Sequence, residues 1–137
     1  MPILPPLCSS DPAPLQEPDL AEAIAAGSPF LRQLMQRDPD YAAVVFRDAP
    51  GDLLAAEIAM LDTLDPALSQ AEVMRALRRA KRRAALLIAV ADLAGRWTME
   101  QVTAALTRFA DASLQAAICW LLSDSARQGK LRLFWRV

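Results

Sequence analysis

Apolar residues recur three and four positions apart along much of the chain, the spacing that places side chains on one face of an α-helix. The longest such pattern predicts a helix from Ser69 to about Ala94. Leu86, Ile88 and Val90 widen its apolar face toward the end, so we expect that half to be the buried central helix of a bundle. The residues of the face are Val73, Leu77, Ala80, Ala84, Leu87, Ala91 and Ala94.

Capping residues predict where the shorter helices begin. Ser28-Pro29 and Asp38-Pro39 each place a capping side chain before a proline that suits the first helical turn, which predicts helices over about 29–37 and 39–49. Asp52 is expected to cap a helix over 53–64, and a short helix is expected over 19–26.

Two capping boxes begin the longer helices. Ser69 pairs with Glu72, and Thr98 pairs with Gln101, so that each side chain bonds to the other residue's backbone amide. We expect the helix after Thr98 to kink or break near Asp111, because its apolar positions shift there to a different face. Gly129 is expected to end it.

Composition supports an all-α fold, a multi-helix bundle around a long alanine-rich helix. Alanine and leucine dominate, whereas aromatic residues make up only 6% of the chain, which favours helix over strand. Six of the ten prolines fall in residues 1–18, which we interpret as an extended lead-in. The bundle domain is predicted over residues 19–130, followed by a tail over 131–137.

Several kinds of active site are excluded by residue content. The chain has no histidine, which excludes Ser-His and Cys-His nucleophile pairs and histidine-ligated zinc. Cys8 and Cys119 lack the spacing of a metal or redox motif. We therefore predict no catalytic residue, metal ligand or cofactor-binding residue in this chain. The same two cysteines favour a reduced, cytoplasmic protein. The most apolar run, 84–94, is too short to cross a membrane, which requires about 20 residues.

Charge is segregated between the two halves of the chain. Residues 1–69 carry eleven acids and three arginines, a net charge of −8. Residues 70–137 carry twelve bases and five acids, a net charge of +7, so the two halves sum to the net charge of −1. The candidates to bind phosphate or an acidic partner surface share one side of the central helix and are Arg75, Arg79, Arg82 and Arg83. The alternative is a solvated basic face that pairs with the chain's own acidic half. Nucleic acid is not favoured, because no aromatic residues interleave with the bases.

Other conspicuous side chains have structural interpretations. Asp38 and Asp40 form a D-x-D pair of the kind that holds magnesium, but their place at a helix start favours capping. Asp92 lies among apolar residues in the last turn of the central helix, so it is expected to be buried and to need a cationic or amide partner. Trp97 and Trp120 are expected to anchor the core.

The order of features between Leu77 and Leu122 resembles a known family. The segment contains the run L-R-R-x-K-R-R, the helix end A-D-L-A-G and the pattern T-x-x-L-T-x-F-A-D-A. Together they resemble the N-terminal helical region of bacterial glutamine synthetase adenylyltransferase/adenylyl-removing enzymes, over roughly residues 27–130. In that family the region precedes the first nucleotidyltransferase core, so the tail is expected to be the first strand of that core or simply the end of this segment.

The resemblance implies a function for a parent enzyme. Such an enzyme attaches AMP from ATP to a tyrosine of glutamine synthetase and removes it by phosphorolysis, using magnesium. This chain would be a non-catalytic helical segment, with the rest of the enzyme, glutamine synthetase and a nitrogen-signalling protein as implied partners and no role for a membrane. The alternative is a free-standing all-α interaction protein that docks an acidic partner through its basic helix.

Overall fold

A computed structural model describes residues 17–132, which form six α-helices. No strand occurs within this range, so the predicted all-α fold is confirmed. The helices are α1 (Glu17–Gly27), α2 (Pro29–Arg37), α3 (Pro39–Arg47), α4 (Pro50–Asp62), α5 (Gln70–Leu93) and α6 (Met99–Arg127). The expected lead-in lies largely outside the described residues, as does the tail beyond Arg132.

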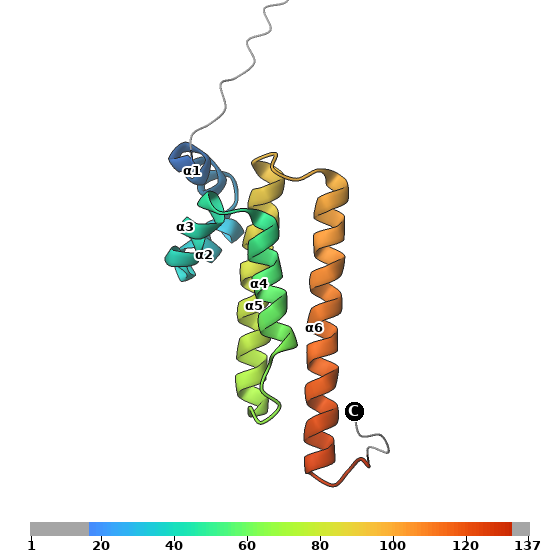
Figure 1. Ribbon diagram of the computed structural model, residues 1–137. Helices are drawn as coiled ribbons and strands as arrows, with labels where there is room; N and C mark the ends of the chain where they lie inside the picture. The colour runs from blue at the N-terminus through green and yellow to red at the C-terminus, as the bar shows by residue number, and fades with distance from the viewer. Residues whose placement is uncertain (1–16, 133–137) are drawn as a thin grey trace, which may run out of the picture.

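The three long helices run antiparallel, side by side. Figure 1 shows α4 and α5 forming a hairpin, with α6 returning along it and extending past the end where α5 begins. The three short helices form a cluster beside the opposite end of the hairpin, where α2 and α3 pack on α5. The centre of the fold is therefore α5, which contacts helices on both sides.

The core forms around the second half of α5, as the widened apolar face predicts. Leu87 is completely buried, and Leu86 and Val90 are each 1% exposed. Leu54 of α4 and Val45 of α3 belong to the same cluster. At about 25 cal/mol for each Å² of buried apolar surface, these side chains supply much of the driving force for folding.

The helix boundaries confirm most of the capping predictions. The hydroxyl of Ser28 accepts the N–H of Leu31, and both capping boxes form, Ser69 with Glu72 and Thr98 with Gln101. Gly95 and Gly129 follow the two longest helices with φ of 67° and 71°, values that glycine adopts without strain. In both cases the two residues after the C-cap bond back to the last turn, the pattern of a Schellman motif.

Several predicted helix boundaries are wrong. Asp52 does not cap α4, because the helix begins earlier, at Pro50, where proline suits the first turn, and Ala49 precedes it without a side-chain cap. Both ends of the first short helix differ by a residue or two from expectation, since α1 begins at Glu17 and includes Gly27. Likewise α3 ends at Arg47, before the extended residues that lead to Pro50.

The expected kink in the last helix is also wrong. α6 continues without interruption from Met99 to Arg127, through Asp111, which is exposed. The apolar positions that shift beyond Asp111 include Leu114 and Ile118, which are 61% and 46% exposed. The shift therefore marks a second apolar face of a straight helix, not a bend that keeps one face buried.

The burial that its apolar neighbours predicted for Asp92 does not occur. Asp92 is exposed, and the adjacent Leu93 is 58% exposed, because the last turn of α5 reaches the end of the bundle. Among residues 17–132, no helix is long and apolar enough to span a membrane.

Candidate functional site

Arg83 of α5 lies at the centre of a polar cluster within the bundle. Its Nε donates a 2.8 Å hydrogen bond to Oδ2 of Asp38, and its Nη1 donates a 3.4 Å bond to Oε1 of Glu57. Its guanidinium carbon lies 4.5 Å from the centre of the Tyr41 ring, a cation–π contact. One side chain of α5 therefore connects the α2–α3 junction with α4.

Local sequence explains how the two carboxylates reach Arg83. Asp38 ends α2 and caps α3, where its Oδ1 accepts the N–H of Tyr41 at 3.3 Å. Glu57 occurs on the buried face of α4, between Leu54 and Leu61, and is only 4% exposed. A carboxylate at that depth is unfavourable unless a cation pairs with it, and Arg83 provides the cation.

The cluster shifts the pKa values of its two acids in opposite directions. Burial is the largest effect on Asp38 and acts to raise its pKa, but the hydrogen bonds from Arg83 and from the Tyr41 amide outweigh it and the pKa is lowered. Burial dominates for Glu57, so its pKa is raised despite the attraction of Arg83. Burial, reinforced by the charge of Glu57, also raises the pKa of Tyr41.

The two aspartates of the D-x-D pair have structural roles in this arrangement. Asp38 is used for capping and for pairing with Arg83, while Asp40 is exposed in the first turn of α3. The capping interpretation of the D-x-D pair is therefore confirmed. Within the described part of the chain, no three histidine, cysteine or acidic residues cluster in a way that would hold a metal ion.

The structure divides the predicted basic face. Arg83 points inward to its acids, whereas Arg75, Arg79 and Arg82 are exposed. Arg79 and Arg82 line a small hollow of about 40 Å³, together with Arg37 at the end of α2. Arg75 does not line it. The alternative was that the basic face pairs with the acidic half of the chain. Within residues 17–132, Arg83 is the one of the four arginines that forms such ion pairs.

A largely apolar groove of about 620 Å³ runs between α5 and α6. Its floor includes Ile88 and Phe109, and Leu106 and Leu114 of α6 line it while remaining more than half exposed. Its basic members come from α5 and are Arg78 and Lys81.

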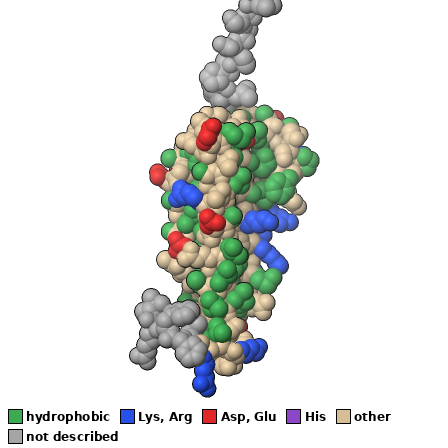
Figure 2. Space-filling model, turned by 90° about the vertical axis from the view of Figure 1, so that its right-hand side faces the viewer, with side chains coloured by type: hydrophobic (Ala, Val, Ile, Leu, Met, Phe, Trp, Pro, Cys, Tyr) green, Lys and Arg blue, Asp and Glu red, His purple; other side chains and the backbone are tan. Residues whose placement is uncertain are grey.

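Beside this groove, α6 exposes a long apolar face. Met99, Leu106, Leu114, Ile118 and Leu121 are between 46% and 72% exposed. At 100° per residue these positions occupy about a third of the helix circumference. Figure 2 looks onto this side of the molecule and shows hydrophobic side chains gathered along it. Exposed apolar surface of this extent is typical of a protein interface.

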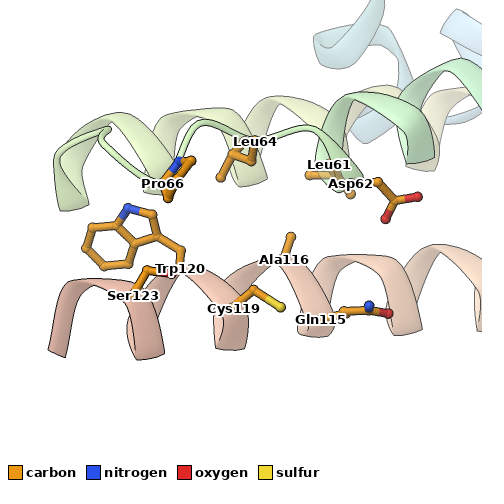
Figure 3. A pocket seen from close by; sticks show the side chains of 9 residues that line it. All are labelled: Leu61, Asp62, Leu64, Pro66, Gln115, Ala116, Cys119, Trp120 and Ser123. Carbon is orange, nitrogen blue, oxygen red and sulfur yellow. The ribbon is translucent and has the colours of Figure 1, made fainter. Parts of the chain in front are cut away.

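A third hollow, of about 450 Å³, lies between α6 and the loop that joins α4 to α5 (Figure 3). Trp120 is the residue that connects the two sides, because its Nε1 donates a 3.0 Å hydrogen bond to the carbonyl of Leu68. Cys119 also lines the hollow, and Asp62 is the one ionisable side chain that the lining contains besides it. The expectation that Trp120 anchors the core is confirmed, and Trp97 packs against the main core with partial exposure.

Sequence reasoning missed several residues of these contacts. Glu57 carried a signal, since it lies three residues after Leu54 and four before Leu61 and so shares their buried face. Arg37 and Arg96 carried none. The guanidinium of Arg96 donates to the carbonyls of Val45, Phe46 and Asp48 and so satisfies the end of α3, a contact across some fifty positions.

The sequence of this chain is similar to one family of known proteins. Residues 19–132 match the family described as glutamate-ammonia ligase adenylyltransferase. A bifunctional glutamine synthetase adenylyltransferase/adenylyl-removing enzyme from Xanthobacter autotrophicus is 48% identical over 109 residues, which cover 80% of this chain and 11% of that protein. A protein of the same description from Rhodopseudomonas palustris is 43% identical over 118 residues, covering 83% of this chain and 12% of that protein.

The chain therefore spans only about a tenth of the length of these relatives. No solved structure matches it significantly.

Proposed function

Because the chain belongs to the glutamate-ammonia ligase adenylyltransferase family, we propose that it is a non-catalytic helical region of a bifunctional enzyme that adenylylates and deadenylylates glutamine synthetase. The whole enzyme would transfer AMP from ATP to a tyrosine of glutamine synthetase and remove it by phosphorolysis. We place it in the cytoplasm, in nitrogen regulation, with a nitrogen-signalling protein as a further partner.

The observation that carries this proposal is the exposed apolar face of α6. Leu114 is 61% exposed and Leu121 is 54% exposed, on a helix whose opposite side packs on α4 and α5. The relatives are roughly nine times longer than the region they share with this chain, so their remaining residues supply surface for such a face to pack on. The proposed occupant of the α6 face is accordingly the remainder of the same enzyme, and burial of its leucines would provide the driving force.

Magnesium and ATP belong, in this proposal, to the remainder of the enzyme. Phosphoryl and nucleotidyl transfer require carboxylates fixed around a metal ion and backbone amides around the phosphates. In residues 17–132 the D-x-D pair is taken up by helix capping, and no metal-binding cluster is present. The described residues therefore do not fit magnesium, and no catalytic step is assigned to them.

A second candidate function rests on the exposed arginines. Arg79 and Arg82, which face away from the α6 groove, favour a free-standing interaction protein that binds an acidic partner. The reading frame downstream of this sequence distinguishes the two candidates. A frame that continues into a glycine-serine turn with paired aspartates favours the enzyme. A stop codon favours the free-standing protein.

The proposed function is tested by supplying the chain to a relative that lacks the matching region. The chain alone should neither transfer AMP to glutamine synthetase nor remove it, whereas its addition should restore activity to the shortened enzyme. The double variant Leu114→Gln/Ile118→Gln should restore less, and Phe30→Gln, an equally exposed apolar position on α2, should restore as much as the unmodified chain. Turnover by the chain alone, lost when Asp38 or Asp40 is replaced, would overturn the non-catalytic assignment.

A further inference from the structure

The hollow lined by Arg37, Arg79 and Arg82 combines a concentration of positive charge with a buried hydroxyl. The three arginines come from the end of α2 and from successive turns of α5. None of them forms an ion pair with a carboxylate among the described residues. Like charges that line one small hollow repel one another, so an anion that binds between them is favoured.

The one acid in the lining is already committed. Asp38 uses Oδ2 to pair with Arg83 at 2.8 Å and Oδ1 to accept the Tyr41 amide. Arg83 also pairs with Glu57, which lies behind it in the core. The four arginines of the lining are Arg37, Arg79, Arg82 and Arg83. Together with the negative charges of Asp38 and Glu57 they leave a net charge of +2 around the hollow.

Tyr41 gives an independent reason to expect a ligand. It lines the same hollow and is 7% exposed, and its hydroxyl is buried with no hydrogen-bond partner among the described residues. Buried polar groups are nearly always hydrogen-bonded, because an unpaired one is unfavourable by about 1–3 kcal/mol. The guanidinium carbon of Arg83 lies 4.5 Å from the centre of the Tyr41 ring, and this contact helps to hold the ring in place.

We propose that Arg37, Arg79, Arg82 and the Tyr41 hydroxyl form a binding site for a phosphoryl group. Guanidinium groups bind phosphate oxygens through paired, charge-assisted hydrogen bonds, and a tyrosine hydroxyl donates one more. The hollow holds little more than one small group, since a water molecule occupies about 30 Å³ of liquid. A compact oxyanion fits this volume with its remaining oxygens toward solvent. The proposal does not rest on the function proposed above.

Titration of inorganic phosphate into the 137-residue chain, followed by the backbone amide NMR signals of Leu34 and Leu86, tests the site. Both residues line the hollow. We expect a saturable shift with half-saturation below about 10 mM, and no such shift with sodium chloride at equal ionic strength. Arg37→Gln, Arg79→Gln and Arg82→Gln should each weaken binding about 5- to 10-fold.

Two further variants separate the site from general charge effects. Arg75→Gln removes an exposed arginine of the same helix outside the hollow and should leave binding unchanged. Tyr41→Phe keeps the ring over Arg83 and should weaken phosphate binding several-fold without lowering stability, because it removes only the unpaired hydroxyl. Equal weakening by Arg75→Gln, or unchanged binding in Tyr41→Phe, would overturn the assignment.

The source of the phosphoryl group is distinguished by comparing ligands. AMP that binds at least about tenfold more tightly than phosphate would assign the site to a nucleotide ester, and comparable affinities would assign it to free phosphate. Adenosine should not bind, and adenosine binding as tightly as AMP would contradict the proposal. Polyglutamate that binds more tightly than phosphate, and whose binding is lost in the same arginine variants, would also contradict the proposal. That result would assign the arginines to an acidic polypeptide.

Discussion

Arg83 donates a 2.8 Å hydrogen bond to Asp38 across 45 positions of sequence, and the same aspartate caps the helix that follows it. The bond therefore joins the central helix to the start of α3. Glu57, 26 positions before Arg83, completes the connection to α4. Four of the six helices, α2 to α5, meet at this one guanidinium.

Replacing Arg83 should destabilise the fold substantially. Arg83→Met keeps much of the side-chain volume but leaves Glu57 buried without a cation, and we expect a loss of about 2–4 kcal/mol in the free energy of unfolding. Arg82→Met, at the neighbouring exposed position, should change it by less than about 0.5 kcal/mol. Urea unfolding followed by circular dichroism measures both.

A double replacement checks the reason for that loss. Adding Glu57→Gln to Arg83→Met removes the unpaired charge and should recover part of the stability. Additive losses from the two replacements would show that the pair is not coupled.

Stability should depend on pH in two opposite ways. The raised pKa of Glu57 means that the folded state binds its proton more readily than the unfolded state, so Glu57 lowers stability as the pH rises through its folded pKa. The lowered pKa of Asp38 has the reverse effect: its stabilisation is present above its ordinary pKa and is lost as the pH falls through the folded value. Stability should therefore rise slightly on mild acidification and fall at lower pH.

Variants assign each part of that profile. Glu57→Gln should abolish the rise at mildly acidic pH, and Asp38→Asn should reduce the loss at lower pH. Urea melts over a pH series measure both, and a wild-type profile retained in Glu57→Gln would show that another group causes the rise.

The core should be most sensitive at its centre. Leu87 is fully buried, so Leu87→Ala should lower the free energy of unfolding by about 2–5 kcal/mol through lost apolar burial and the cavity that remains. Met99→Ala, at a position that is 72% exposed, should have little effect. Similar losses in the two variants would mean that the exposed face of α6 is covered in the isolated chain.

Trp120 should determine how firmly the α4–α5 loop is held. Trp120→Phe keeps most of the buried ring but removes the bond to the Leu68 carbonyl, which should lower stability by about 1 kcal/mol. Faster amide hydrogen exchange in residues 63–69, with unchanged exchange in α2, would show that the effect is local.

The helices were predictable from sequence because their signals are local. Ser69 and Glu72 lie within one turn of each other, so the capping box that begins α5 needs no tertiary information. The apolar face around Leu87 similarly identified the central helix, because periodicity and burial agree there. Periodicity and burial disagree at Asp92, which has apolar neighbours but is exposed. The last turn of α5 lies at the end of the bundle, and this tertiary context is not visible in the local sequence.

The candidate sites were predictable only in part. The basic face of the central helix was visible in the sequence. Which of its arginines is buried depends on the contact between Arg83 and Glu57, which belong to distant segments of the chain. Arg37 and the Tyr41 hydroxyl join Arg79 only through the packing of α2 and α3 on α5. The apolar shift after Asp111 was detected correctly and interpreted wrongly, because a second exposed face and a bent helix give the same pattern.

The affinity of the purified chain for the remainder of a family enzyme tests the central claim most directly. Isothermal titration should show one-to-one binding, weakened at least about tenfold by Leu114→Gln/Ile118→Gln and unchanged by Phe30→Gln, because only the former pair lies on the exposed face of α6. Absence of binding by a chain that is folded by circular dichroism, or equal weakening by Phe30→Gln, would contradict the account.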